Sequence, residues 1–245
     1  MPSGQCFGGH GTIRRMWART PEQVLFLRRT REVIILYALF VAPGLASPVM
    51  PDTFTMSVSP LIALTLRNVA FALLVLYLLD IQDETTLLGA SIRELRPGLV
   101  ALVWLLLFGA SLLVSAAASA VGVDARGLAG AFTGAENSVL RSPLGIATLG
   151  GAMLSVGLVE ELLFRAYLIA RLMQLRVRPL PAAGAAALLF AVGHSYQGLP
   201  AVLFAFVAGL GLGLLWLRRP ALTSFAVGHA AYNLSAVAIA AWYAG

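Results

Sequence analysis

The residues of this 245-residue sequence that could do chemistry are polar side chains set inside long apolar stretches: Glu160, Glu161, Arg165, His194, His229 and Asn233. A charge at the centre of a bilayer costs roughly 2.5 to 3.5 kcal/mol on insertion scales, so such residues usually mark function. A carboxylate, two imidazoles and an amide are the groups of a water-activating site, in which a general base deprotonates water and other groups donate hydrogen bonds to an oxyanion. They predict a hydrolytic site within the membrane.

The spacing of the two glutamates predicts different surroundings for them. Glu161 and Arg165 are four residues apart, so on a helix they share a face and neutralise each other. Glu160 lies about 100° around the helix from Glu161, which leaves it free to point elsewhere. Glu160 is therefore the candidate general base, whereas Glu161 and Arg165 are candidate supporting residues.

Two further apolar stretches present polar or aromatic groups at the same helical spacing, with Phe190 as a third candidate supporting residue. Phe190 and His194 are four residues apart, as are His229 and Asn233. Counted at about 1.5 Å per residue, Glu160, His194, His229 and Asn233 all lie about 15 to 21 Å from the ends of their segments, near the middle of a membrane. Their common depth predicts one shared site. Ser195 has no motif around it and is interpreted as a bystander.

The composition favours an all-α fold, a polytopic bundle of transmembrane helices. Hydrophobic residues make up 59% of the chain and charged residues 11%, against about a quarter in soluble domains, and the mean hydropathy is +0.86. Runs near 20 residues cross a bilayer as helices. About seven spans are predicted, at residues 33–50, 59–79, 98–122, 144–170, 181–197, 199–217 and 221–243.

The distribution of arginines predicts the topology. All 17 basic residues are Arg, and 13 of them fall on one side of the predicted spans, which indicates a cytoplasmic N-terminus and argues against nucleic-acid binding despite the net charge of +6. The weakest span, 33–50, is interrupted by Pro43 and Gly44, and its alternative interpretation is a cleaved signal peptide.

The chain divides into three parts by these criteria. Residues 1–32 form a basic cytoplasmic segment, 33–143 form N-terminal transmembrane helices and loops, and 144–245 form the catalytic transmembrane core. Arg67 lies inside the second span, and two interpretations stay open for it: it snorkels to the interface, or it pairs with a glutamate.

Small residues predict close packing between helices of the core. Gly209, Gly211 and Gly213, and the alanine-rich run at 182–187, have side chains small enough for membrane helices to approach one another closely.

Three sequence blocks carry a resemblance to a known family: Glu160-Glu161-Leu-Leu-Phe-Arg165, Phe190-Ala-Val-Gly-His194 and His229-Ala-Ala-Tyr-Asn233. In this order, over residues 144–240, they resemble the CPBP family of CAAX protease and bacteriocin-processing intramembrane enzymes, also called the Abi family. The resemblance implies a glutamate-dependent intramembrane endopeptidase. It implies that Glu160 and His194 activate water and that His229 and Asn233 stabilise the oxyanion. It also implies that Glu161 and Arg165 form a supporting pair.

The resemblance favours a water activated without a cofactor, and zinc is the alternative. Glutamate and histidine are ordinary zinc ligands, although the His-Glu-x-x-His helix is absent. The single Cys6 forms neither an internal disulfide nor a cysteine-based metal site.

The expected partners are the lipid bilayer and a membrane-embedded or lipidated protein cut near its C-terminus, with no nucleic acid. We expect an integral protein of the bacterial inner membrane. Two other functions stay open: a proton-coupled transporter using Glu160, His194 and Arg67 as a relay, and a non-catalytic immunity or scaffold protein.

Overall fold

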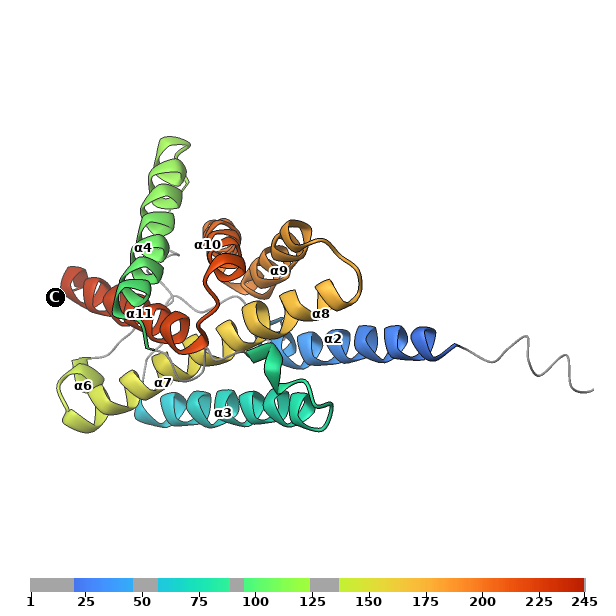
Figure 1. Ribbon diagram of the computed structural model, residues 1–245. Coiled ribbons are helices and arrows are strands. Elements are labelled where there is room, and N and C mark those ends of the chain that lie inside the picture. The colour runs from blue at the N-terminus through green and yellow to red at the C-terminus, as the bar shows by residue number, and fades with distance from the viewer. Residues whose placement is uncertain (1–19, 46–56, 89–94, 124–136, 245) are drawn as a thin grey trace, which may run out of the picture.

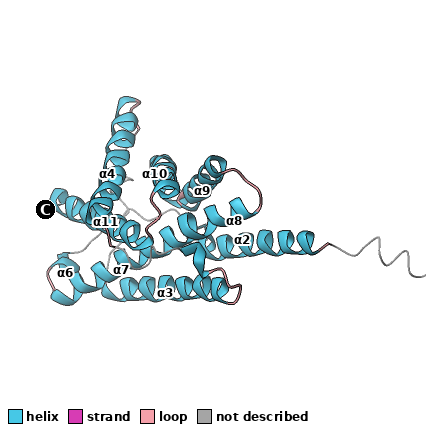
Figure 2. Ribbon diagram, in the orientation of Figure 1, coloured by secondary structure: helices cyan, strands magenta, loops and turns pink. Residues whose placement is uncertain are grey.

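A computed structural model describes residues 20–45, 57–88, 95–123 and 137–244, and in these every regular element is a helix (Figures 1 and 2). In chain order they are α2 (Pro21–Leu45), α3 (Val58–Asp80), η1 (Thr85–Leu88), α4 (Pro97–Ala120), α6 (Asn137–Leu140), α7 (Pro143–Glu161), η3 (Leu162–Leu168), α8 (Ile169–Gln174), α9 (Pro179–Gly193), η4 (Ser195–Gln197), α10 (Leu199–Arg218) and α11 (Leu222–Ala244). The all-α fold predicted from the composition is confirmed.

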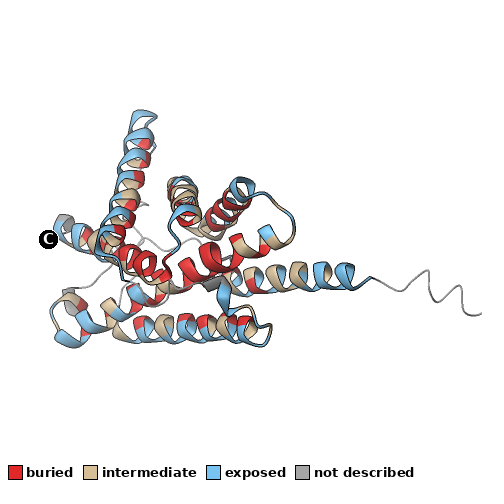
Figure 3. Cartoon of the chain, viewed as in Figure 1, coloured by how far each residue is buried: buried red, intermediate tan, exposed pale blue. Residues whose placement is uncertain are grey.

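A central rod made of α7, η3 and α8 organises the molecule. In Figure 1, α3 lies along one side of this rod, and α9 and α10 lie on the other. The α11 helix packs against both α7 and α4. All seven residues of η3 are buried, and Figure 3 shows burial concentrated along the rod while the outer faces of α3 and α4 are exposed. The rod that carries Glu160 and Glu161 is therefore the core of the bundle.

Five helices are long and apolar enough to cross a membrane: Val58–Asp80, Pro97–Ala120, Pro143–Gln174, Leu199–Arg218 and Leu222–Trp242. They correspond to five of the seven predicted spans. Their outward faces carry large exposed hydrophobic residues, as helices that contact lipid require. The number of seven spans and the cytoplasmic N-terminus stay predictions.

The limits of the other two predicted spans need correction. Helix α2 begins at Pro21, twelve residues before the predicted start, because its basic stretch is also good helix-forming sequence; residues 46–50 of that span lie outside the described residues. The helix predicted at 181–197 is α9, which has 15 residues and ends at Gly193. The positive φ of Gly198 then allows the sharp turn into α10.

The predicted packing through small residues is confirmed. A Cβ atom added at Gly209 would lie 3.1 Å from the Phe190 ring and 3.3 Å from Ala187 of α9, and one at Gly213 would lie 3.3 Å from Ala183. At Gly211 the neighbour is Leu106 of α4, at 2.9 Å. The glycines of α10 therefore bring α9, and with it the end that carries His194, close to the central bundle.

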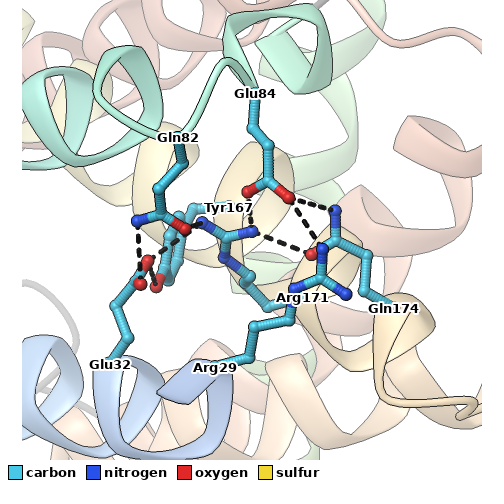
Figure 4. A network of polar contacts seen from close by, with 7 residues as sticks. All are labelled: Arg29, Glu32, Gln82, Glu84, Tyr167, Arg171 and Gln174. Carbon is cyan, nitrogen blue, oxygen red and sulfur yellow. Dashed lines mark hydrogen bonds and ion pairs between the residues drawn. The ribbon is translucent and has the colours of Figure 1, made fainter. Parts of the chain in front are cut away.

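A network of polar side chains fastens α2 and the segment after α3 to the end of the rod (Figure 4). Its centre is the fully buried Arg171, which donates to Glu32 of α2 at 2.9 Å and also to Glu84. Arg29 donates to Glu84 at 2.8 Å, and the Tyr167 hydroxyl donates to Glu32 at 2.6 Å. Because Arg171 is paired on both sides, its burial is compensated, and the network holds α2 against the rod.

Candidate active site

A cavity of about 70 Å³ lies between the central rod and the ends of α2 and α9. Glu160 lines it from α7 and His194 lines it from the end of α9. The remaining lining residues are Phe40, Val41, Gly44, Arg67, Phe164, Phe190, Gly193 and Tyr196. The pair predicted to activate water therefore faces one small space, lined by both polar and aromatic side chains.

Glu160 and Glu161 stand at the point where the rod changes from α-helix to π-helix. The α-helical part ends at Glu161, and η3 (Leu162–Leu168) has the wider π geometry. Such π segments are rare and frequently occur at functional sites, because they shift the directions of the side chains that follow. Arg165 still reaches back to Glu161, with its Nε 3.2 Å from Oε2. The predicted pairing of these two residues is confirmed.

His229 of α11 lies between the two carboxylates. Its Nδ1 is 2.8 Å from Glu161 Oε1, and its Nε2 is 3.5 Å from Glu160 Oε2. An ionised carboxylate only accepts hydrogen bonds, so Nδ1 carries the hydrogen and donates it to Glu161. The Nε2 atom is thereby directed toward Glu160. The expectation that Glu160 points away from Glu161 needs this refinement: both reach the same ring, but at opposite nitrogens.

Gly157 makes the contact between α7 and α11 possible. It lies one turn before Glu161, and a Cβ atom there would be 2.5 Å from the carbonyl oxygen of Ala226 and 3.2 Å from the Ala230 nitrogen, both on α11. Only glycine permits the two backbones to approach this closely. The close approach brings the His229 ring within reach of both glutamates.

Arg165 is a fully buried cation with two kinds of neighbour. Besides its ion pair with Glu161, its guanidinium lies over the Phe190 ring, 4.6 Å from the centroid. Its two terminal nitrogens make no hydrogen bond to the described residues. The charge is therefore compensated by one carboxylate and one aromatic face. Phe190 in turn contacts His194, so the supporting residues form a continuous chain of contacts.

His194 is held at the end of α9 by Phe190. It caps the helix, and its Nδ1 lies 2.8 Å from the carbonyl oxygen of Phe190, which only accepts. The hydrogen therefore resides on Nδ1, and Nε2 keeps its lone pair. The Phe190 ring packs edge to face against the imidazole, with centroids 4.5 Å apart. The sequence predicts His194 within a helix; the structure places it at the helix end, which gives the ring access to the cavity.

The structure brings three of the four predicted catalytic side chains together. Glu160 and His194 share the cavity. His229 contacts Glu160 but does not line the cavity. Asn233 is buried one turn farther along α11 and does not line the cavity. Sequence reasoning left open the place of Arg67, which lines the cavity, and missed Tyr196 entirely. A tyrosine two residues after the helix-capping His194 gives no signal of its own.

The acidic and imidazole groups do not form an evident metal site. Within the described parts of the chain, no three or more His, Cys, Asp or Glu side chains are grouped to hold a metal ion. Zinc binding by Glu160, His194 and His229 therefore stays an alternative prediction.

Comparison with known proteins gives a match to a family model. Residues 142–235 match the family model described as type II CAAX prenyl endopeptidase Rce1-like. No curated protein and no solved structure matches the chain significantly. The matched region begins just before α7 and ends within α11, so it includes Glu160, His194, His229 and Asn233.

Proposed function

We propose that the chain is a CAAX protease that hydrolyses peptide bonds within the membrane with water activated by Glu160 and His194; the match of residues 142–235 to the Rce1-like family model supports this proposal. The family match and the five helices apolar enough to cross a membrane support an integral membrane protease. The substrate that suits such a site is a membrane-embedded or lipidated protein cut near its C-terminus. We place the enzyme in the bacterial inner membrane.

The observation that carries this mechanism is the shared cavity of Glu160 and His194. A water in this space would meet a carboxylate and the free Nε2 of His194, so one group takes the proton and the other orients the water. The rings of Phe164 and Phe190 line the same space, and an apolar surface beside the reacting groups strengthens electrostatic interactions with them.

His229 then takes part in the proton transfer. When Glu160 accepts a proton from water, the neighbouring Nε2 of His229, 3.5 Å away, becomes a hydrogen-bond acceptor for it. The proton is held between these groups until the tetrahedral intermediate breaks down, and it passes to the amine nitrogen as the C–N bond breaks. Glu161 stabilises the charge on the ring through Nδ1. The roles of His229 and Asn233 as oxyanion donors stay a prediction.

The decisive experiment compares cleavage by the wild-type protein with cleavage by Glu160→Gln and His194→Gln. Membrane proteomes of cells with wild-type or variant protein are compared for C-termini that remain uncut, and a cleaved protein found in this way is incubated with the purified protein in lipid nanodiscs. We expect the variants to lose at least about 100-fold in rate while remaining folded.

The matched control is Glu22→Gln, which removes an exposed carboxylate at the start of α2 and should leave cleavage unchanged. A folded Glu160→Gln variant with the wild-type rate contradicts the mechanism. The two alternative functions are distinguished in the same preparations: a transporter moves substrate into liposomes without cutting it, and a scaffold keeps its biological effect in Glu160→Gln.

A further inference from the structure

Arg67 is a cation at membrane depth, outside the residues that the mechanism uses. It lies near the middle of α3 (Val58–Asp80), one of the helices apolar enough to span the membrane. It lines the cavity that holds Glu160 and His194, and its side chain is exposed. Among the described residues, no carboxylate lies within ion-pair distance of its guanidinium. A charge of this kind is costly in lipid and needs an anionic partner.

The guanidinium is oriented by a short chain of hydrogen bonds. Its Nε and Nη2 atoms donate to Asn68 Oδ1 at 3.4 and 3.3 Å. The buried Asn68 donates through Nδ2 to Ser155 Oγ at 3.2 Å, and Ser155 donates to the Ala152 carbonyl at 2.8 Å. Ser155 and Ala152 belong to α7, the helix that carries Glu160. Arg67 is thereby held against the catalytic helix.

This arrangement leaves one edge of the guanidinium free. Asn68 occupies the side formed by Nε and Nη2, so the end formed by Nη1 and the second hydrogen of Nη2 has no partner in the described structure. Two parallel N–H groups at this end match the two oxygens of a carboxylate. A single oxyanion oxygen could accept from both only through bent hydrogen bonds, whereas a carboxylate accepts both in line. The geometry therefore suits a carboxylate better than the oxyanion of the reaction.

We propose that the free end of the Arg67 guanidinium binds a carboxylate of the substrate beside the Glu160 and His194 cavity. This inference rests on the proposed function, because it positions the substrate at Glu160. The negative charge of Glu160 would repel a substrate carboxylate from the cavity, and Arg67 offsets this repulsion. Two sources share the required chemistry: the C-terminal carboxylate of a peptide and an acidic side chain next to its C-terminus.

The test measures binding rather than cleavage, so it does not depend on the protease assignment. The probe is a fluorescein-labelled apolar decapeptide, made with a free C-terminal carboxylate, with a C-terminal amide, and as an amide whose last residue is glutamate. Fluorescence anisotropy is recorded with Glu160→Gln protein in lipid nanodiscs, and the signal of empty nanodiscs is subtracted. We expect the acid to bind at least 10-fold more tightly than the plain amide.

Substitution of Arg67 should remove this preference alone. In Glu160→Gln/Arg67→Gln the acid and amide should bind within twofold of each other, at the affinity of the amide. The matched control Arg141→Gln removes an exposed arginine that does not line the cavity, and it should keep the full preference. Tight binding of the glutamate peptide would identify a side-chain carboxylate as sufficient, and weak binding would identify the terminal carboxylate as the group recognised.

A second variant covers the case in which Arg67→Gln fails to fold. Arg67→Lys keeps the charge but not the paired donors, so the preference should fall below 10-fold while staying above twofold. Equal binding of all three peptides to Glu160→Gln, or an equal loss of all three in the Arg67 variants, overturns the proposal. Retained cleavage in Glu160→Gln would instead reject the catalytic mechanism and leave the binding result as it stands.

Discussion

His229 donates its Nδ1 hydrogen to Glu161 at 2.8 Å, although the two residues are 68 positions apart on α11 and α7. This hydrogen bond determines which ring nitrogen faces Glu160. It also distinguishes two adjacent glutamates. Glu161 is fully buried and pairs with Arg165 and His229, whereas Glu160 lines the cavity. The two glutamates should therefore respond differently to substitution.

Substitution of Glu161 should damage the fold more than substitution of Glu160. Glu161→Gln leaves the buried Arg165 without a negative partner, and breaking a buried ion pair in this way costs about 3 to 5 kcal/mol. Glu160→Gln removes a charge that faces a cavity, so the melting temperature should change little while cleavage is lost. Thermal unfolding in detergent, followed by tryptophan fluorescence, measures the melting temperatures of both variants. A higher melting temperature for Glu161→Gln than for Glu160→Gln contradicts the assignment.

A methyl group at Gly157 should separate α7 from α11. The added Cβ would lie 2.5 Å from the backbone oxygen of Ala226, which cannot move without shifting the helix. We expect Gly157→Ala to lose about 1 to 3 kcal/mol of stability and most of its activity, since His229 moves away from the glutamates. Gly150→Ala on the same helix meets nothing within 4 Å and should be neutral or slightly stabilising. Equal melting temperatures of the two variants would refute this account.

Phe190 should contribute to catalysis by holding His194. Phe190→Leu keeps an apolar side chain but loses the ring contacts with Arg165 and with the imidazole. We expect kcat to fall by about 10- to 100-fold from misorientation of His194, because small displacements of a catalytic group have effects of this size. Phe204→Leu is the control, because that ring stacks on Tyr232 and does not line the cavity. The idea fails if the two variants have the same kcat.

Acid should weaken the network around Arg171. Burial acts to raise the pKa of Glu84, but the hydrogen bonds and charges of Arg171 and Arg29 outweigh it and hold this pKa below its ordinary value of 4.5. A depressed carboxyl pKa contributes stability that is fully present above the unfolded pKa and is lost as the pH falls through the folded pKa. The melting temperature of Glu84→Gln should therefore lie below that of wild type at pH 7, and the gap should shrink below pH 4.5.

The control for this pH dependence is Glu22→Gln, whose carboxylate is exposed at the start of α2. Its melting temperature should follow that of the wild-type protein at every pH between 7 and 3. A constant difference between wild type and Glu84→Gln over this range would show that Glu84 contributes through packing rather than through its charge.

Chelation separates the metal-free mechanism from the zinc alternative. If Glu160 and His194 activate water directly, incubation with 1,10-phenanthroline should leave the cleavage rate within twofold of the untreated protein. A zinc enzyme would instead lose activity and recover it on addition of Zn²⁺, because the metal supplies the nucleophile. The rate after chelation and after zinc addition decides between them.

The sequence by itself determined the fold class, the positions of five apolar helices and the two histidines, His194 and His229, that meet near Glu160. These properties follow from local quantities: the length of an apolar run, the helical spacing of side chains and the cost of a charge in lipid. The pairing of Glu161 with Arg165 belongs to the same group, because partners four residues apart face each other on one helix. The glycines of α10 were likewise recognisable from their size alone.

Only the tertiary structure decided how the chemistry is divided among these residues. Which nitrogen of His229 faces Glu160 depends on a contact between α7 and α11, and the place of Arg67 in the cavity depends on how α3 lies along the rod. The exclusion of Asn233 from the cavity has the same origin. Rotations of whole helices about their axes set these relationships, and such rotations result from packing over the whole bundle rather than from any local pattern.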